Sequence, residues 1–302
     1  MKNAIKVLIF VFAVIIIGAG SVWGYINYAV SDFEYADSAK SDTIEVNQYN
    51  GEEDVVVIPE KYKGKVVTSI AAETFLNSDI KSVEIPDTVT VIEQKAFYQC
   101  SELETVKMSE NVKSIGESAF INCSKLKSIY LPASLETIDC AAFYGCNDLT
   151  FTIADGADFV FEDGVLYNKS KTVVYWVSGK KDLSSFSFPS TVNTFLPYAL
   201  AGHNELKSFN VPVGVTSIPD SMFLSCTNLE TVIIPDTVTT IGSTVFFGDT
   251  KLKEITLPKS VGTIGKNNFP VKDASDFILK VYENSSAHFY AQENDINFEV
   301  IK

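Results

Sequence analysis

The chain has 302 residues, 46% of them hydrophobic and 21% charged, so it is long enough for one or two folded domains and lacks the composition of a disordered protein. Its net charge is -14, and all 24 basic residues are lysines, because the sequence contains no arginine. An acidic chain without guanidinium groups, which bind phosphates in a bidentate manner, excludes nucleic acid as the partner.

Residues 7–31 form an uncharged and strongly apolar stretch that follows Lys2 and Lys6 and ends before Asp32, the first acidic residue. A helix of that length reaches about 37 Å, enough to span a hydrocarbon core of about 30 Å. The lysines predict that the N-terminus stays in the cytoplasm and that the rest faces outside. A cleaved signal peptide is the alternative interpretation. Residues 1–31 are thus a predicted membrane anchor or signal segment, and the protein is either a single-pass membrane protein with an extracellular C-terminal part or a secreted one.

Residues 32–54 are polar and predict a short stalk. A 23-residue repeat then fills residues 55–152, with units that begin at Val83, Val106 and Ile129 and a degenerate first copy from Ile58. The same unit returns over residues 186–270. Within each unit the apolar positions stay constant while the residues between them vary, as in Val83, Ile85, Val89, Ile92, Ala96, Phe97, Cys100 and Leu103.

A unit of 23 residues cannot bury its own apolar face, so neighbouring units must stack their equivalent residues into continuous columns. The alternation in Val83-x-Ile85, followed by Pro86, predicts a short strand that pairs in parallel with the same segment of the next unit. The Ala-Phe segment is expected to return as a helical or irregular turn. The sequence therefore predicts an α/β repeat solenoid with parallel strands along one face.

The units from Leu103 to Leu126 and from Ile234 share the pattern I-P-x-x-V-x-x-I-G-x-x-A-F-x-x-C-x-x-L-x-x-V most fully. This pattern resembles the BspA-like leucine-rich repeats of bacterial surface proteins over about residues 55–270. The resemblance implies a right-handed, repeat-built ectodomain, and members of this family are associated with adhesion, host matrix binding or coaggregation. Fold alone does not identify a ligand.

Residues 153–185 interrupt the repeats with the apolar runs FVFEDGVLY and TVVYWV, which flank a polar turn at residues 168–171 and predict an inserted β-hairpin. The hairpin either joins two repeat arrays or presents Tyr167, Tyr175 and Trp176 as an exposed aromatic surface for sugar or protein. Residues 271–302 predict a C-terminal cap that consists of a strand at 278–282, a helix at about 287–294 and a strand at 298–301. A cap of this kind covers the open edge of a repeat array.

Four of the five cysteines, Cys100, Cys123, Cys146 and Cys226, are assigned to one repeat position, where Gly202 and Asp249 are expected in other copies. A buried column of small residues explains this pattern, whereas Cys140 lies off the column as a possible free surface thiol. The sequence leaves the redox state of all five open. The two histidines, His203 and His288, do not neighbour a nucleophile, and neither zinc-ligand spacing nor a nucleotide-binding motif occurs. The chain is therefore predicted to be a non-enzyme that uses no metal or cofactor.

Repeat proteins commonly bind partners along the variable positions of successive strands. The outward strand residues here are Glu84, Lys107, Tyr130, Asn210, Ile233 and Thr256. Tyr130 and Ile233 are plausible contacts, although single exposed apolar residues are common in proteins. The leading hypothesis is a cell-surface binding protein for a protein or glycan. A structural or assembly scaffold of the cell envelope is the alternative.

Overall fold

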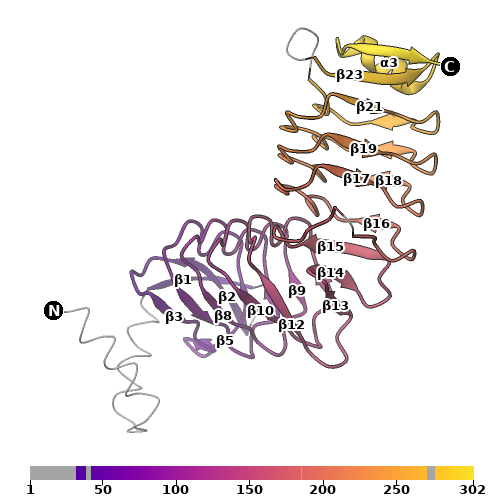
Figure 1. The fold of residues 1–302 in the computed structure, drawn as a ribbon. Helices are drawn as coiled ribbons and strands as arrows, with labels where there is room; N and C mark the ends of the chain where they lie inside the picture. The colour runs from indigo at the N-terminus through magenta and orange to yellow at the C-terminus, as the bar shows by residue number, and fades with distance from the viewer. Residues whose placement is uncertain (1–31, 39–41, 185, 271–275) are drawn as a thin grey trace.

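The computed structural model describes residues 32–38, 42–184, 186–270 and 276–302. Two stacked arrays of repeats meet at an angle and give the molecule a bent shape (Figure 1). We call residues 32–153 the first array, 154–193 the joint and 194–302 the second array. Each array has its own hydrophobic cluster. The predicted anchor at residues 7–31 lies outside the described residues, and among those described no helix has the length and apolar character needed to cross a membrane.

The first array has two columns of parallel strands rather than the single column that the sequence predicted. The predicted column contains β3 (Val55–Val57), β6 (Ser82–Glu84), β8 (Thr105–Lys107), β10 (Ser128–Leu131) and β12 (Thr150–Ile153). The second contains β5 (Lys65–Ile70), β7 (Val91–Ile92), β9 (Ser114–Ile115) and β11 (Thr137–Ile138). Because most of its strands have only two residues, the second column leaves no alternating pattern in the sequence.

The Ala-Phe segments are turns, not helices, and the fold is therefore almost entirely strand and turn instead of α/β. Each segment holds two residues in the left-handed region, as at Lys95 (φ 55°) and Gln99 (φ 60°), which a right-handed helix cannot accommodate. Successive turns are joined by backbone hydrogen bonds, such as that from Phe97 N to Ala119 O at 2.8 Å. The turns thus satisfy their backbone groups between repeats instead of within one.

A column of stacked phenylalanine rings fills the centre of the first array. Phe75, Phe97, Phe120 and Phe143 are buried, and their ring centroids are 4.8, 5.0 and 5.7 Å apart, with neighbouring rings within 13° of parallel. The corresponding column of the second array contains Phe223, Phe246 and Phe269 and begins with Leu200. The constant phenylalanine of the repeat is therefore the main core residue, as the sequence indicated.

Residues 32–54 are not a stalk. They form β1 (Phe33–Asp37) and β2 (Thr43–Tyr49), an antiparallel pair in which β2 also pairs in parallel with β5. The short β4 (Lys61–Tyr62) pairs with β5 as well. Phe33 and Val46 are buried against the first repeat. The segment covers the open end of the array, and the apolar residues that alternate along FEYAD and TIEVNQY provide the buried face.

The joint contains three strands rather than one hairpin. β13 (Phe159–Glu162), β14 (Val165–Asn168) and β15 (Val173–Val177) are antiparallel neighbours, and β15 then pairs in parallel with β16 (Thr194–Phe195). The predicted turn at residues 168–171 does connect β14 with β15. The run FVFEDGVLY is divided by Asp163 and Gly164, whose φ angles of 51° and 77° suit a two-residue hairpin turn.

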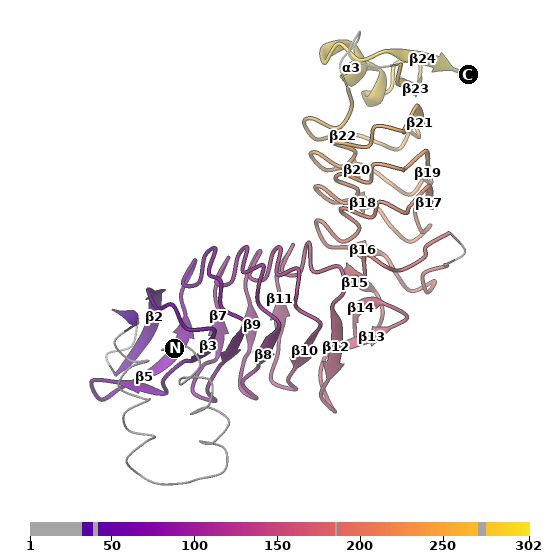
Figure 2. The same ribbon diagram turned by 60° about the vertical axis from the view of Figure 1, so that its left-hand side comes forward.

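The second array repeats the two-column plan and ends in a cap. One column contains β17 (Ser208–Asn210), β19 (Thr231–Ile233) and β21 (Glu254–Thr256), and the other contains β18 (Ser217–Ile218), β20 (Thr240–Ile241) and β22 (Thr263–Ile264), as Figure 2 shows. The cap consists of β23 (Ile278–Tyr282), α3 (Ser286–Glu293) and β24 (Phe298–Ile301). The two strands begin and end where the sequence predicted, and the helix differs by one residue at each end.

Candidate recognition surfaces

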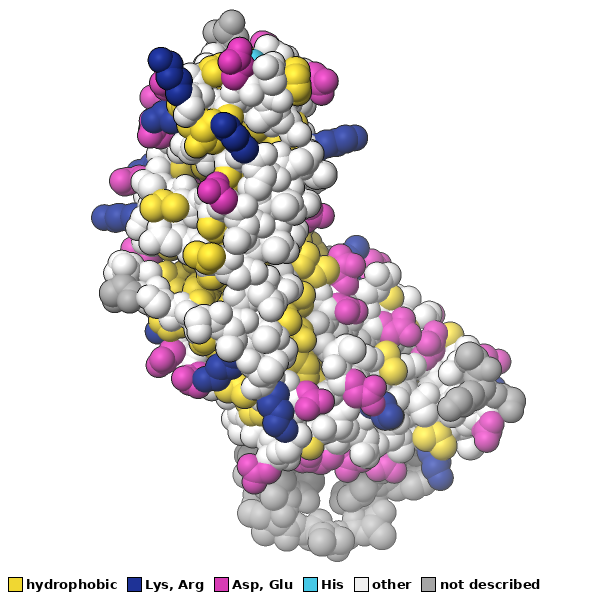
Figure 3. Space-filling model, turned by 90° about the vertical axis from the view of Figure 1, so that its right-hand side faces the viewer, with side chains coloured by type: hydrophobic (Ala, Val, Ile, Leu, Met, Phe, Trp, Pro, Cys, Tyr) yellow, Lys and Arg dark blue, Asp and Glu magenta, His cyan; other side chains and the backbone are white. Residues whose placement is uncertain are grey.

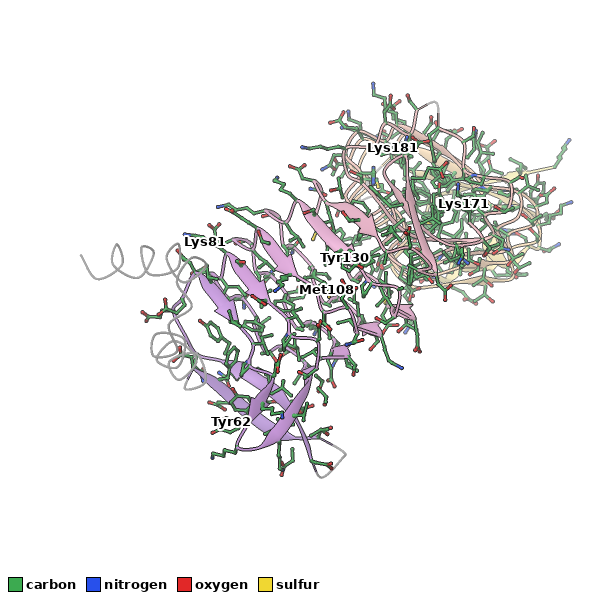
Figure 4. The ribbon with its side chains drawn as sticks, turned by 90° about the horizontal axis from the view of Figure 1, so that it is seen from below. Tyr62, Lys81, Met108, Tyr130, Lys171 and Lys181 are labelled. Carbon is green, nitrogen blue, oxygen red and sulfur yellow. The ribbon has the colours of Figure 1, made fainter. Side chains whose placement is uncertain are left out.

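The strand face of the first array carries Glu84, Lys107 and Tyr130 on three successive strands. Glu84 and Lys107 are directly opposite in the sheet and form an exposed ion pair. The Tyr130 hydroxyl donates a hydrogen bond to the Glu110 carboxylate at 2.9 Å, and this bond is the main reason that the pKa of Tyr130 is raised. Its ring packs partly against the core, one turn after Met108 (Figure 4). These three side chains already have partners within the chain.

The strand-face side chains of the second array interact less with other side chains than those of the first array. Asn210 lies directly opposite Ile233, and Thr256 lies opposite Lys280 of the cap. The Ile233 side chain is 58% exposed although it lies on β19, which pairs in parallel with β17. Ile233 is thus a large aliphatic side chain exposed to water among polar strand-face residues. A partner could cover it.

Two of the three predicted hairpin aromatics are buried, so the proposed exposed aromatic surface is wrong for them. Tyr167 is 2% and Trp176 is 6% exposed. The Trp176 indole Nε1 donates to the backbone oxygen of Phe143 at 3.1 Å, which ties the joint to the last turn of the first array. Burial raises the pKa of Tyr167 to about 12. These aromatic residues connect the two arrays rather than display a binding surface.

Tyr175 is only half-buried and lines an open hollow of about 370 Å³ with Glu136, Asp158 and Lys169. Its ring meets that of Phe159 edge to face, with centroids 5.2 Å apart. The hollow is wide and shallow, and its Asn168 side chain is fully occupied by bonds to the turn that follows. Tyr175 is therefore the one predicted hairpin residue that remains available to a ligand.

The buried column of cysteines is confirmed, and the described chain contains no disulfide. The Sγ atoms of Cys100, Cys123, Cys146 and Cys226 donate to a backbone oxygen of the preceding turn at 2.9 to 3.2 Å. Burial raises the pKa of Cys100 to about 12, so this thiol stays protonated. Cys140 lies off the column and is half-buried.

The column continues through His203 and not through Gly202, as the sequence had suggested. His203 is 2% exposed, and its Nε2 lies 3.3 Å from the backbone oxygen of Val177, the same kind of contact that the thiols make. Gly202 occupies the left-handed position one residue earlier, with φ 75°. The column thus brings His203, Cys226 and Asp249 onto successive turns, although their burial keeps substrate away and the described residues contain no cluster suited to a metal ion.

A third surface, which the sequence reasoning missed, lies on the turns that follow the second strand column. We call it the turn face. The residue directly after the buried phenylalanine or Leu200 is apolar in seven copies: Leu76, Tyr98, Ile121, Tyr144, Ala201, Leu224 and Phe247. Ile121 is 8% exposed, and the other six are half-buried or exposed. Core packing does not require this choice, because these positions are mostly half-buried or exposed. Their apolar character in seven copies was the available sequence signal.

The model of the BspA type leucine-rich repeat region matches residues 58–171 and 175–289, well over half of the chain. The chain belongs to the BspA-type leucine-rich repeat family. A leucine-rich repeat protein of Eubacterium ventriosum is 25% identical, with a TM-score of 0.58 over 79% of this chain and 75% of that chain. The pneumococcal vaccine antigen PcpA is 20% identical, with a TM-score of 0.54 over 90% of this chain and 97% of that chain, and so shares the fold. No curated protein matches the chain.

Membership of the BspA-type family agrees with the architecture, in which the repeats supply a long scaffold and the variable outward residues supply chemistry. A leucine-rich-repeat solenoid of this type is typically a binding scaffold rather than a catalytic one. Among the three surfaces described, the strand face is polar with an isolated isoleucine, the hollow at Tyr175 is shallow, and the turn face is apolar over many repeats. Each would select a different kind of partner.

Proposed function

We propose that this BspA-type protein is exported and acts as a non-enzymatic recognition module at the bacterial cell surface, where it binds a protein or a glycan. Family membership supports the surface location, and so does the apolar stretch at residues 7–31 that follows Lys2 and Lys6. A solenoid whose repeat strands run in parallel presents an extended face to a partner, which suits recognition better than chemistry.

The observation that carries the proposal is the environment of Ile233. This side chain is 58% exposed, and both its register partner Asn210 and the equivalent residue of the next repeat, Thr256, are polar and uncharged. Burying an isoleucine against a partner contributes on the order of 2 kcal/mol, and the amide and hydroxyl supply directional hydrogen bonds. The first array adds Glu84, Lys107 and Tyr130 as a charged and aromatic extension of the same face.

The test is binding of the full chain in a nonionic detergent to arrays of matrix proteins, glycans and envelope proteins. Ile233→Ala and Tyr130→Ala should each weaken binding of the ligand that the wild type captures. Val213→Ala is the matched control, because Val213 is also an exposed aliphatic residue, at 72%, but lies in the loop after β17. Equal loss in the control, or unchanged binding in both strand-face variants, would contradict the assignment to this face.

Export has a separate test. Intact cells treated with a protease that cannot enter them should lose the repeats while a cytoplasmic control protein survives. The mass of the protein recovered from membranes then distinguishes an anchored chain, which retains residues 1–31, from one that has been cleaved and secreted. Protection of the repeats in intact cells would contradict an extracellular recognition module.

The alternative function, an assembly scaffold of the envelope, is favoured by one observation at the C-terminal end. β24 is the outermost strand of its sheet, and Phe298 and Val300 on it are 37% and 45% exposed. An exposed edge strand with apolar side chains invites pairing with another chain. Crosslinking in cells through a cysteine introduced at Glu299 would capture a neighbouring protein under this alternative and none under the first proposal.

A further inference from the structure

The turn face is one continuous apolar column in each array. Leu76 and Phe247, near the two ends, are 41% and 58% exposed, and Tyr98, Tyr144 and Leu224 between them are half-buried. In a repeat protein the positions that face water normally vary and are mostly polar. Six of the seven turn-face positions are accessible to solvent and yet apolar, with only Ile121 buried, so they form a stripe of exposed apolar surface that a partner could cover.

The bend of the molecule brings the turn faces of both arrays to the inside of the angle. In Figure 2 the turns that follow β7, β9 and β11 and those that follow β16, β18 and β20 line the two sides of that angle. At its apex the rings of Tyr144 and Tyr198 are 5.6 Å apart, and together with Asp139 and Pro197 they line a narrow crevice. The stripe therefore has two walls that could hold one elongated ligand.

Carboxylates accompany the stripe near the apex. Glu117 and Asp139 from the first array and Asp220 from the second all act on the half-buried thiol of Cys140, where they add to burial in raising its pKa. Glu93, one repeat earlier, acts in the same way on the carboxyl of Glu45. None of these four carboxylates has a lysine partner in the described part of the chain, whereas some carboxylates elsewhere, such as Asp54 and Glu102, form ion pairs.

We propose that the turn face binds a segment of another protein in which lysine or arginine side chains accompany large apolar side chains. The apolar stripe takes the hydrophobic side chains, and the carboxylates of Glu117, Asp139 and Asp220 pair with the cations. Figure 3 shows hydrophobic side chains along the boundary where the arrays meet and acidic side chains on the adjoining surface of the first array. This arrangement is complementary to a basic, amphipathic segment.

A second copy of the chain fits this surface poorly, because the chain carries a net charge of -14 and many of its lysines are already paired with carboxylates. The site is also distinct from the strand face, since it is built from residues 9 to 14 positions after the strand-face residue of each repeat. The inference deepens the proposed recognition function by naming a partner chemistry, but it uses separate residues and can fail independently of it.

The test uses a fluorescein-labelled peptide of three Lys-Phe-Lys-Leu units and a second peptide with glutamate in place of lysine. Fluorescence anisotropy measures binding of each to the full chain in a nonionic detergent. The triple variant Glu117→Gln, Asp139→Asn and Asp220→Asn removes the turn-face charges. The matched control changes three exposed carboxylates on other sides of the repeats, Glu104→Gln, Glu230→Gln and Asp236→Asn, and so alters the net charge equally.

We expect the lysine peptide to bind the wild type and the glutamate peptide to bind much more weakly. The turn-face triple variant should weaken binding by about tenfold or more, and the control by less than about twofold. Phe247→Ser should also weaken binding, whereas Ile233→Ala on the strand face should not. Binding should fall as ionic strength rises from about 0.05 M to about 0.5 M.

Several outcomes would overturn the proposal: no binding of the lysine peptide to the wild type, equal affinity for both peptides, or equal weakening by the two triple variants. Circular dichroism melting of each variant checks that the changes at these exposed carboxylates leave the fold intact. Suppose that Ile233→Ala binds the lysine peptide normally but loses the protein or glycan ligand that the wild type captures. Both surfaces are then recognition sites. If peptide binding fails while strand-face binding remains, only the turn-face assignment is wrong.

Discussion

The two arrays follow the same repeat, but the columns inside them differ. In the first array the central column is phenylalanine on four successive turns, and the thiol column is cysteine on three. In the second array Leu200 takes the place of the first ring, and His203 and Asp249 flank Cys226 in the thiol column. The second array nevertheless buries a comparable set of residues in its own cluster. The repeat therefore tolerates substitution at buried column positions while the hydrophobic cluster around them is retained.

The thiol column teaches what that position requires. A donor must reach the backbone oxygen of the preceding turn, and cysteine and histidine both do so, at 2.9 to 3.3 Å. Asp249 is 7% exposed, and neither of its carboxylate oxygens has a hydrogen-bond partner. Burial raises the pKa of this carboxyl from 3.8 to about 8. Asp249 can act as a donor only while it is protonated, so the second array should be the more sensitive to pH.

The largest expected effect is the loss of a ring from the first array. Phe120→Ala removes a side chain that is 0% exposed and stacked between Phe97 and Phe143, and it should lower the free energy of unfolding by about 3–5 kcal/mol. Because each repeat contacts its neighbours only, the loss should be concentrated in the first array. Hydrogen exchange resolved along the chain measures the protection of both arrays.

The matched control is Phe246→Ala, which removes the corresponding ring between Phe223 and Phe269. It should reduce protection in the second array and leave the first largely unchanged. Equal loss of protection in both arrays from either variant would mean that the two clusters unfold as one unit, which would remove the distinction between the arrays.

Next in size is the restoration of the thiol column by Asp249→Cys. The variant should be more stable than the wild type by about 2 kcal/mol at pH 7, the typical cost of burying a polar group without a partner. Urea denaturation followed by circular dichroism measures the difference. Asp236→Asn, which removes an exposed carboxylate of the same repeat, should change the stability very little.

The pH dependence of that difference has a definite sign. Between about pH 4 and pH 8 the folded chain holds a proton on Asp249 that the unfolded chain has released. The stabilisation of the folded state by protonated Asp249 is fully present below pH 4 and is lost as the pH rises toward 8. The free energy of unfolding of the wild type therefore falls over this window. The advantage of Asp249→Cys should therefore grow from pH 4 to pH 8. An advantage that stays constant with pH would contradict the buried, protonated carboxyl.

The period of 23 residues was enough to predict the solenoid, the Phe97-type core and the thiol column, because stacking forces equivalent residues into line. It was not enough for the second strand column, whose two-residue strands such as Val91–Ile92 carry no periodic signal. Counting 17 positions from Phe186, where the repeat begins, also assigns His203 to the thiol column. The neighbouring Gly202 was predicted instead, because a small residue was expected there. The error came from expecting a small residue, whereas His203 fits the position through its hydrogen bond to the backbone oxygen of Val177.

The joint and the surfaces were harder to predict because they depend on contacts between distant segments. Tyr167 and Trp176 look like surface aromatics in sequence, but Phe143 lies against Trp176 only once the arrays have met. The Asp163-Gly164 turn, in contrast, was a standard hairpin signal that could have been recognised. The turn face depends on the apolar residue after each phenylalanine and on the angle between the two arrays. Only the apolar residues can be recognised in the sequence.

A smaller effect is expected when a thiol of the first array is removed. Cys123→Ala eliminates the Sγ donor to Phe97 O at 3.2 Å and leaves that carbonyl with one partner fewer, at a cost of about 1 kcal/mol. Cys140→Ala, off the column and half-buried, is the control and should cost less. Thermal melts of the two variants compare them directly. A greater loss in Cys140→Ala would show that the column contributes less than its geometry suggests.

The smallest effect should come from the strand face, where the arrays differ most in charge. Lys107→Gln breaks the exposed pair with Glu84 and should change the free energy of unfolding by less than about 0.5 kcal/mol, since solvent screens such pairs and ordering the side chains has an entropic cost. Double-mutant analysis with Glu84→Gln measures the coupling. A coupling well above 1 kcal/mol would mean that the first array depends on its strand-face charges for stability, and that these residues are not free to serve recognition.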